Sequence, residues 1–251
     1  MIKKHWKCAA VTPYYQETRT QLERCLASVQ LQSIKTDHFL VSDGFAQDWL
    51  DQTDVRHLRL GEGHADYGNT PRGLGALLAA SEQYDAIFFL DADNWLEPEH
   101  VALCIDASAS SFGTSLDCDI VFSKRIFRRI DGTIMSISEE PNHTDTNCYF
   151  FFPGAFHLLS FWITMPKIMS SVGDRVFHAL VKSRDLRTAE CDRPTVNYHS
   201  TWSAHYRALG EDPPIGTKES VQINLKAAFD LMSEREMEIV SRLTGGLVWK
   251  R

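Results

Sequence analysis

The sequence predicts an α/β fold built on a mostly parallel, doubly wound sheet, with a mixed α+β second half. Three observations support this prediction. Short apolar runs alternate with amphipathic helical segments over residues 8–123, which is the pattern of β-α-β units. Residues 86–90 read Ala-Ile-Phe-Phe-Leu, and a run without polar positions is typical of a central strand covered on both faces. Near residue 123 the alternation stops and a hairpin signal follows.

The first half contains five apolar runs that predict strands. They lie at residues 8–12, 39–41, 55–60, 86–90 and 119–123. After the first run, Thr18 and Gln21 have the spacing of a capping box, and apolar residues follow at helical spacing from Leu22. Thr70 and Pro71 predict a second helix, with Thr70 as the N-cap and Pro71 as the first helical residue. We therefore expect strands and helices to alternate throughout this half.

The second half is less regular. Asp131-Gly132 lies between two apolar segments and is a strong signal for a hairpin turn. The polar residues 139–147 are interpreted as a linker or loop. Residues 149–165 are largely apolar but fall short of the ~20 residues that cross a bilayer, so we expect a buried strand and loop there. Residues 221–243 have the spacing of a final amphipathic helix.

Composition and charge exclude several classes of function. The 251 residues carry a formal net charge of −7, which argues against a nucleic-acid binder because binding along phosphates requires clustered Lys and Arg. One local basic cluster is interpreted as a solvated hairpin face; it comprises Lys124, Arg125, Arg128 and Arg129. No CxxC pair and no secretory segment is present, so we expect a cytoplasmic protein with reduced cysteines. Peripheral membrane contact and oligomerisation are both compatible with the sequence.

Polar side chains follow three of the predicted strands. Residues 12–17 follow the first strand, Asp43 the second, and Asp91 with Asp93 the fourth. The carboxyl ends of parallel strands share one edge of the sheet, where open α/β sheets bind ligands. Two carboxylates in one crevice repel each other unless a cation or a proton intervenes, and Mg²⁺ and Mn²⁺ favour carboxylate and phosphate oxygens. Although Asp-x-Asp alone is more often a turn, its place here predicts a metal that bridges a diphosphate.

Four segments, taken in order, resemble the family-2 glycosyltransferases, which have a GT-A fold. These segments are Thr12-Pro-Tyr-Tyr15, Val41-Ser-Asp-Gly44, Pro71-Arg-Gly-Leu-Gly75 and Phe89-Leu-Asp-Ala-Asp93. The resemblance implies a GT-A type fold, a nucleotide-sugar donor (a UDP-sugar first of all), a Mn²⁺ or Mg²⁺ cofactor and, usually, inversion at the anomeric carbon. It also implies that residues 1–122 bind the nucleotide sugar. Residues 123–251, with the C-terminal helix, would bind a saccharide or other hydroxyl acceptor and complete the catalytic site.

The resemblance assigns the nucleotide pocket to the first half. Pro13 and Tyr14 would line the base pocket, with Glu17 nearby. Asp43 would accept a hydrogen bond from the base or the ribose. Ser42 precedes it where many members of the family have a second acid, which leaves the identity of the base open.

Three further residues of the first half match positions that handle the sugar diphosphate. Arg72 would pair with donor or acidic groups, with a solvated arginine of the first helical turn as the alternative. Asp91 would contact the ribose or a metal-bound water, and Asp93 would bind the metal directly. Gly73 stands where the family frequently has an asparagine.

The remaining candidates are Asp174 and His199 in the second half and Trp95 in the first. Residues 172–177 resemble the family segment that carries the catalytic carboxylate, so Asp174 is the candidate general base for the acceptor hydroxyl; a simple N-cap is the alternative. His199 matches the late histidine that many GT-A enzymes place on the metal, with His205 or a plain core histidine as alternatives. Trp95 directly follows the acidic motif and is the first candidate for stacking against an acceptor sugar.

Three other functions compete with glycosyl transfer. A nucleotidyltransferase usually carries a Gly-rich loop and a basic residue after its first strand, and residues 12–17 contain neither. A non-catalytic relative that binds a nucleotide sugar or a partner would not need the intact acids at Asp91, Asp93 and Asp174. An oxidoreductase of the Rossmann type needs the full glycine fingerprint, of which Gly61-Glu-Gly63 is only a part. Metal-dependent glycosyl transfer is therefore the favoured prediction.

Overall fold

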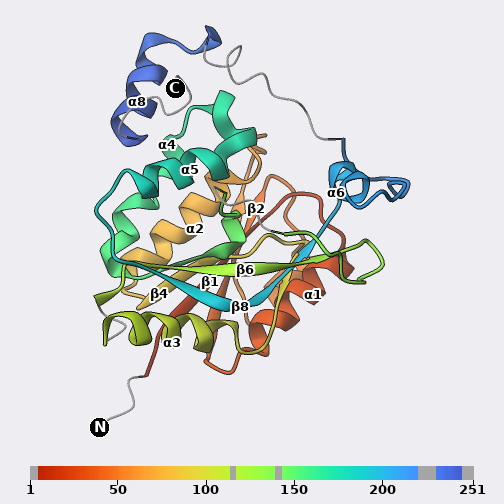
Figure 1. Ribbon diagram of the computed structural model, residues 1–251, viewed down its shortest axis with the longest axis horizontal. Coiled ribbons are helices and arrows are strands. Elements are labelled where there is room, and N and C mark those ends of the chain that lie inside the picture. The colour runs from red at the N-terminus through yellow and green to blue at the C-terminus, as the bar shows by residue number, and fades with distance from the viewer. Residues whose placement is uncertain (1–4, 114–116, 139–142, 220–229, 245–251) are drawn as a thin grey trace.

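The computed structural model of this chain describes residues 5–113, 117–138, 143–219 and 230–244. Within them, one eight-stranded sheet has the strand order β3-β2-β1-β4-β7-β6-β8-β5. The strands are β1 Cys8–Tyr14, β2 Thr36–Asp43, β3 Arg56–Leu60, β4 Ala86–Phe89, β5 Trp95–Leu96, β6 Ile120–Arg128, β7 Tyr149–Phe151 and β8 Thr188–His199. Helices cover both faces of this sheet (Figure 1), so the predicted α/β architecture is confirmed.

Most of the helices lie in two layers, one on each side of the sheet. They are α1 Arg19–Gln30, α2 Asn69–Ser81, α3 His100–Phe112, α4 Phe161–Thr164, α5 Gly173–Lys182, α6 Ser203–Ala208 and α8 Glu234–Thr244. Figure 1 shows α1 and α3 on one side of the sheet and α2, α4 and α5 on the other. Short 3₁₀ segments complete the described structure; they are η1 Asp48–Gln52, η3 Thr146–Cys148, η4 Pro153–Leu158 and η5 Lys167–Val172.

The first four strands in space, β3, β2, β1 and β4, are mutually parallel, as predicted. In β1 the side chains alternate between the two helical layers. Ala9 and Val11 belong to the core cluster that contains α2, whereas Cys8 and Ala10 belong to the cluster that contains α1 and α3. This is why the strand is apolar at consecutive positions: both of its faces are buried. All polar side chains that leave these strands at their carboxyl ends therefore meet at one edge.

The helix starts show one confirmed and one corrected prediction. At α1 the Thr18 hydroxyl accepts from the N–H of Gln21 while the Gln21 side chain accepts from the N–H of Thr18, which completes the predicted capping box. The second helix, α2, begins at Asn69 after Gly68, not at Pro71. Here the Asp66 carboxylate accepts from the Thr70 N–H at 2.9 Å, so an acid outside the helix caps it.

The second half continues the same sheet with a change of direction. β7 inserts between β4 and β6 and is antiparallel to both, whereas β8 is parallel to β6. The apolar run at residues 149–165 forms β7, η4 and α4, as a buried strand and loop. No helix within the described residues is long and apolar enough to span a bilayer.

The predicted hairpin is present only as a tight turn. Gly132 has φ +87° in this turn, a conformation that glycine adopts without strain. Beyond it the second arm makes only one isolated bridge, between Arg128 and Ile134. The predicted final helix is present in part as α8, which begins at Glu234, because the chain leaves the helical conformation at Met232 and Ser233. Residues 221–229 of that prediction lie outside the described residues.

Close packing between α2 and its neighbours accounts for the glycines at two positions of this helix. A Cβ atom at Gly73 would lie 2.5 Å from Cγ1 of Ile163 in α4, and one at Gly75 would lie 2.7 Å from Cγ1 of Val11 in β1. Side chains at these positions would force the helices and the sheet apart. On the far side of α4, Trp162 stacks on Phe177 of α5 with ring centroids 4.6 Å apart. The contact through Gly73 therefore joins the helix of the first half to those of the second.

Candidate active site

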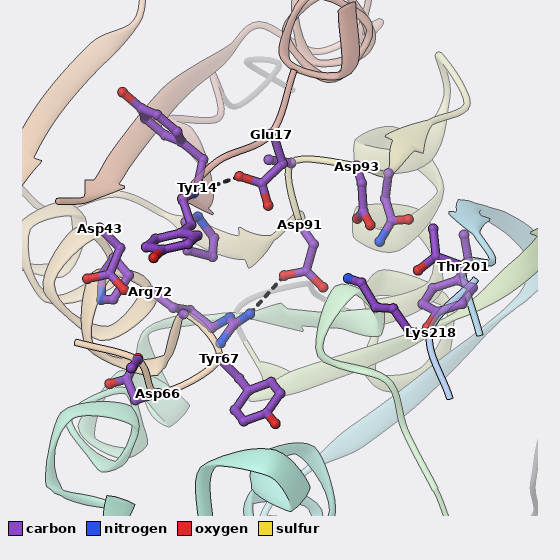
Figure 2. A pocket seen from close by; sticks show the side chains of 18 of the residues that line it. Tyr14, Glu17, Asp43, Asp66, Tyr67, Arg72, Asp91, Asp93, Thr201 and Lys218 are labelled. Atoms are coloured by element: carbon purple, nitrogen blue, oxygen red, sulfur yellow. Dashed lines mark hydrogen bonds and ion pairs between the residues drawn. The ribbon is translucent and has the colours of Figure 1, made fainter. Parts of the chain in front are cut away.

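A cavity of about 420 Å³ opens at the carboxyl ends of the parallel strands, and we call it the strand-end cavity (Figure 2). Its walls come from the ends of β1, β2, β4 and β8, the start of α2 and the segment that follows α6. The residues that line it are Pro13, Tyr14, Tyr15, Glu17, Asp43, Ala65, Asp66, Tyr67, Gly68, Pro71, Arg72, Asp91, Ala92, Asp93, Asn94, Tyr198, Thr201, Trp202 and Lys218. Seven of the predicted site residues are among them: Pro13, Tyr14, Glu17, Asp43, Arg72, Asp91 and Asp93.

Two residues at the ends of β1 and β2, Tyr14 and Asp43, are held in place by hydrogen bonds. The Tyr14 hydroxyl lies 2.7 Å from Nε2 of His57 and accepts from the N–H of Gln47 at 3.0 Å. The buried Asp43 carboxylate accepts from the His64 N–H at 3.0 Å and lies 2.6 Å from His64 Nδ1. Both of these contacts use Oδ1, so the second oxygen of Asp43 can accept a hydrogen bond from a ligand.

Asp91 is fixed by partners from two different parts of the chain. Its Oδ1 accepts from Arg72 at 2.8 Å, and its Oδ2 accepts from the side-chain amide of Asn147 at 2.9 Å. Asn147 in turn accepts from the Asp91 N–H at 2.5 Å. The Arg72 side chain is only 5% exposed, so the solvated-arginine alternative is wrong. Removing Asp91 would leave the buried Arg72 guanidinium without its partner carboxylate, and an uncompensated buried charge typically costs about 3–5 kcal/mol.

The charges around Asp93 indicate whether a cation would be favourable at this edge of the sheet. Burial raises the pKa of Asp93 to about 7, the carboxylates of Asp91 and Glu17 add to the rise, and Lys218 opposes it. The lining of the cavity contains five carboxylates, one of them Asp93, and two cationic side chains, a formal charge of −3. Such a site favours a bound cation, which would relieve the repulsion between the carboxylates. The residues therefore fit a divalent metal.

The described residues do not form a complete metal cage. No group of three or more His, Cys, Asp or Glu side chains there is arranged to hold a metal ion. A metal at Asp93 would need further oxygen ligands from water or from a bound phosphate, as is usual for Mg²⁺. A metal at this position would therefore depend on ligands from outside the protein.

A second cavity of about 660 Å³ adjoins the first at the start of α5, and we call it the α5 cavity. Tyr67, Tyr198 and Trp202 line both cavities. Asp174 lies in the first turn of α5 and lines the α5 cavity. The N-cap of this helix is Val172, and its side chain makes no capping hydrogen bond. Asp174 is therefore not the N-cap, which was the alternative to its role as general base.

Asp174 is paired with a histidine. Its Oδ2 lies 2.6 Å from Nε2 of His143. Burial acts to raise the pKa of Asp174, but the hydrogen bond and the charge of His143 outweigh it, and the pKa falls below its usual value. For His143, burial acts to lower the pKa, and the contact with Asp174 raises it overall. Asp174 is therefore ionised near neutral pH and able to accept a proton.

Two predicted site residues lie outside both linings. Trp95 in β5 is covered by the guanidinium of Arg24, 4.0 Å from the ring centroid. His199 ends β8, and its N–H donates to Asn94 Oδ1 at 2.8 Å. Its Nδ1 is buried without a hydrogen-bond partner among the described residues, and burial followed by the charge of Arg24 lowers its pKa. His205, the competing histidine, lines the α5 cavity.

Two arginines of the basic cluster, Arg125 and Arg129, are paired with acids, whereas Lys124 pairs with Asp192 on the surface. Arg125 is largely buried and donates to Asp145 Oδ2 at 2.9 Å. Arg129 donates to Glu211 at 2.9 Å through its Nε. These charges are therefore compensated within the fold.

Sequence reasoning missed three residues of the site: His143, Asn147 and Lys218. The first two come from the polar stretch interpreted as a linker, which the pairing of β7 with β4 brings beside Asp91. Lys218 reaches the cavity because its backbone pairs with Trp202. No local motif marks any of them, since each depends on contacts between distant segments.

Comparisons with known proteins agree with this architecture. No protein-family model and no curated protein matches the sequence. Among solved structures, TarS of S. aureus, residues 1–349 in complex with UDP, matches with a TM-score of 0.56 and 13% identity over 77% of this chain and 60% of that one. The same fragment in complex with UDP-GlcNAc matches with a TM-score of 0.56 and 13% identity over 94% and 71%. A further TarS structure matches with a TM-score of 0.55 and 12% identity over 81% and 38%. The chain thus spans 60% and 38% of the lengths of two of these TarS chains. At such identities the likeness concerns the fold, which is GT-A-like, as predicted.

Proposed function

We propose that this protein is a glycosyltransferase that moves a sugar from a nucleotide-diphosphate sugar, with a UDP-sugar favoured, to an acceptor hydroxyl. The observation that carries the proposal is the convergence of Glu17, Asp43, Asp91 and Asp93 in one strand-end cavity of formal charge −3. That cavity adjoins a second one with an ionised carboxylate. The likeness to TarS in complex with UDP and with UDP-GlcNAc supports the same class of donor.

The donor would occupy the strand-end cavity. Asp43 would accept from a base or ribose donor, and the N3–H of uracil suits a carboxylate acceptor. Tyr14 would pack against the nucleoside. Its side chain is already held in position, because its hydroxyl contacts His57 and Gln47. Arg72 would hold Asp91 in place for the ribose. Asp93 would hold a Mn²⁺ or Mg²⁺ ion, which as a Lewis acid supplies positive charge beside the diphosphate.

The acceptor would occupy the α5 cavity. Its lining contains two arginines and two aspartates, so it is formally neutral when its histidines are uncharged. Trp202 and Tyr67 present aromatic rings at its border with the strand-end cavity, and Tyr67 is 65% exposed. A neutral, hydroxyl-rich compound such as a saccharide suits this combination better than a strongly charged one.

The reaction would be a single displacement. The acceptor oxygen bonds to the anomeric carbon, its proton passes to Asp174, and the bond from the carbon to the diphosphate oxygen breaks with its electron pair on the diphosphate. This sequence inverts the anomeric carbon. His143 would keep the Asp174 carboxylate ionised and oriented, which is its part in general-base catalysis.

A binding panel tests the proposal. UDP, GDP, CDP and their sugar conjugates, with and without Mn²⁺, are compared by thermal shift and calorimetry. We expect UDP or a UDP-sugar to raise the melting temperature most, and Mn²⁺ to increase the effect. Release of UDP in the presence of a saccharide acceptor would then establish transfer. Stabilisation by NAD alone, or by no nucleoside diphosphate, would contradict the proposal, and incorporation of UTP into a sugar phosphate would indicate a nucleotidyltransferase.

A further inference from the structure

The segment that follows α6 returns to the strand-end cavity. The backbone of Lys218 forms a parallel bridge with Trp202. The Lys218 N–H donates to the Thr201 carbonyl at 2.6 Å, and the Lys218 carbonyl accepts from the Ser203 N–H at 2.9 Å. These bonds fix the main chain of Lys218 beside residues that themselves line the cavity. The C-terminal part of the chain thereby contributes to the wall of a cavity that is otherwise built mainly by the first half.

The neighbours of Lys218 hold it on both sides. Thr217 Oγ1 lies 2.8 Å from Ser203 Oγ. Glu219 accepts two hydrogen bonds from the guanidinium of Arg207, both of 2.7 Å. A residue between two anchored neighbours keeps its side chain on one side of the segment, and the Lys218 side chain is on the cavity side. Its direction is therefore a property of the fold.

The amino group of Lys218 brings a positive charge to the acidic side of the cavity. Figure 2 shows the side chain extending from the Thr201 side toward Asp91 and Asp93. Within the part of the chain that the structure describes, Lys218 forms no ion pair, whereas Arg72 is committed to Asp91. Lys218 is thus the lining cation that is available for an added anion.

We propose that Lys218 binds the diphosphate of the donor and neutralises part of the charge that develops on it as the sugar leaves. This inference rests on the proposed function. A flexible ammonium group suits a phosphate as a point charge, and a cation placed in advance beside a developing negative charge stabilises the transition state without reorganisation. The carboxylates of the cavity outnumber its cations by three, so Lys218 acts in addition to a metal and does not replace it.

The test compares UDP with uridine, because only UDP carries the diphosphate. Dissociation constants are measured by calorimetry in Mn²⁺ for wild type, Lys218→Met and Lys218→Arg. Lys124→Met is the matched control, since Lys124 pairs with Asp192 on the surface and lines neither cavity. Melting temperatures report whether each variant is folded.

We expect Lys218→Met to weaken UDP binding about 10- to 100-fold, the loss typical of a hydrogen bond to a charged group, with uridine binding unchanged. Lys218→Arg should retain most of the affinity for UDP, and Lys124→Met all of it. Unchanged UDP affinity in Lys218→Met, or an equal loss of UDP and uridine, would overturn the inference and leave the proposed function standing. Failure of the wild type to bind UDP would overturn both.

Discussion

The two cavities of the site are built in different ways. The strand-end cavity gathers residues that follow parallel strands, and its lining is acidic, with five carboxylates against two cations. The α5 cavity is formed by the hairpin, the start of α5 and α6, and its two arginines balance its two aspartates. An acidic cavity needs a cation before it can accept a diphosphate, whereas a balanced cavity can accept a neutral ligand directly. Metal dependence should therefore be confined to the donor side.

The largest effect should come from the acidic cavity. Asp93→Asn removes the carboxylate that would hold the metal, so we expect Mn²⁺-dependent UDP binding and transfer to be lost. The measurement is calorimetry with UDP in Mn²⁺ and in EDTA. Asp106→Asn is the control, because Asp106 is an exposed acid of α3 that lines neither cavity. An Asp93→Asn variant that binds UDP and Mn²⁺ like the wild type would remove the metal from this side.

The second-largest effect should show that the two cavities contribute to different steps. Asp174→Asn cannot accept a proton, so we expect the rate of transfer to fall by about 10²- to 10⁴-fold, the usual contribution of general-base catalysis. The affinity for UDP should stay at the wild-type value, because Asp174 does not line the strand-end cavity. Asp185→Asn, at an exposed acid beyond α5, is the matched control. Retained turnover in Asp174→Asn would exclude Asp174 as the base.

A smaller effect should appear in the pH dependence of the α5 cavity. The contact with His143 outweighs burial and lowers the pKa of Asp174. Since the base acts as a carboxylate, transfer should be lost as the pH falls through the pKa of Asp174. His143→Gln removes the opposing charge, so this loss should move to higher pH. Profiles of kcat/KM against pH for wild type, His143→Gln and the exposed-site control His157→Gln check this; coincident profiles would contradict the assigned role of His143.

The smallest effect concerns the contact that joins the two halves. Gly73→Asn introduces a residue that is frequent at this position in the family-2 glycosyltransferases, which the sequence resembles, but its Cβ would meet Ile163 of α4 at 2.5 Å. We expect a loss of about 1–3 kcal/mol in the free energy of unfolding, typical of overpacking. Gly113→Asn is the comparison, because Gly113 has φ +78° and open space around it, and asparagine tolerates that conformation. Equal stability of the two variants would show that α4 yields to the larger side chain.

The same contrast explains what the sequence could predict. Tyr14, Asp43 and Asp91 follow apolar strands within a few residues, so their convergence follows from the parallel sheet alone. His143 and Asn147 lie in a polar stretch without periodicity, and only the insertion of β7 between β4 and β6 brings them to the site. Local patterns cannot specify such pairings between distant segments.

The predictions for Trp95 and His199 show the same limit of local sequence patterns. Trp95 is predicted from its nearness to the acidic motif, and His199 from the resemblance to the late histidine of many GT-A enzymes. The antiparallel pairing of β5 with β8 sets Trp95 opposite Asn197, and Arg24 covers its ring. Neither residue lines a cavity of the site among the described residues. The position of a residue along the chain therefore does not determine the direction of its side chain.

Asn147 has a practical consequence for engineering. Its side-chain amide donates both to Asp91 and to Asp145, and Asp145 accepts from Arg125 of the α5 cavity. A chimera that exchanges the second half to change the proposed acceptor would also exchange Asn147, the residue that orients Asp91 of the first half. Such a chimera should therefore keep residues 145–151 of this chain together with its first half and exchange only the segments that follow.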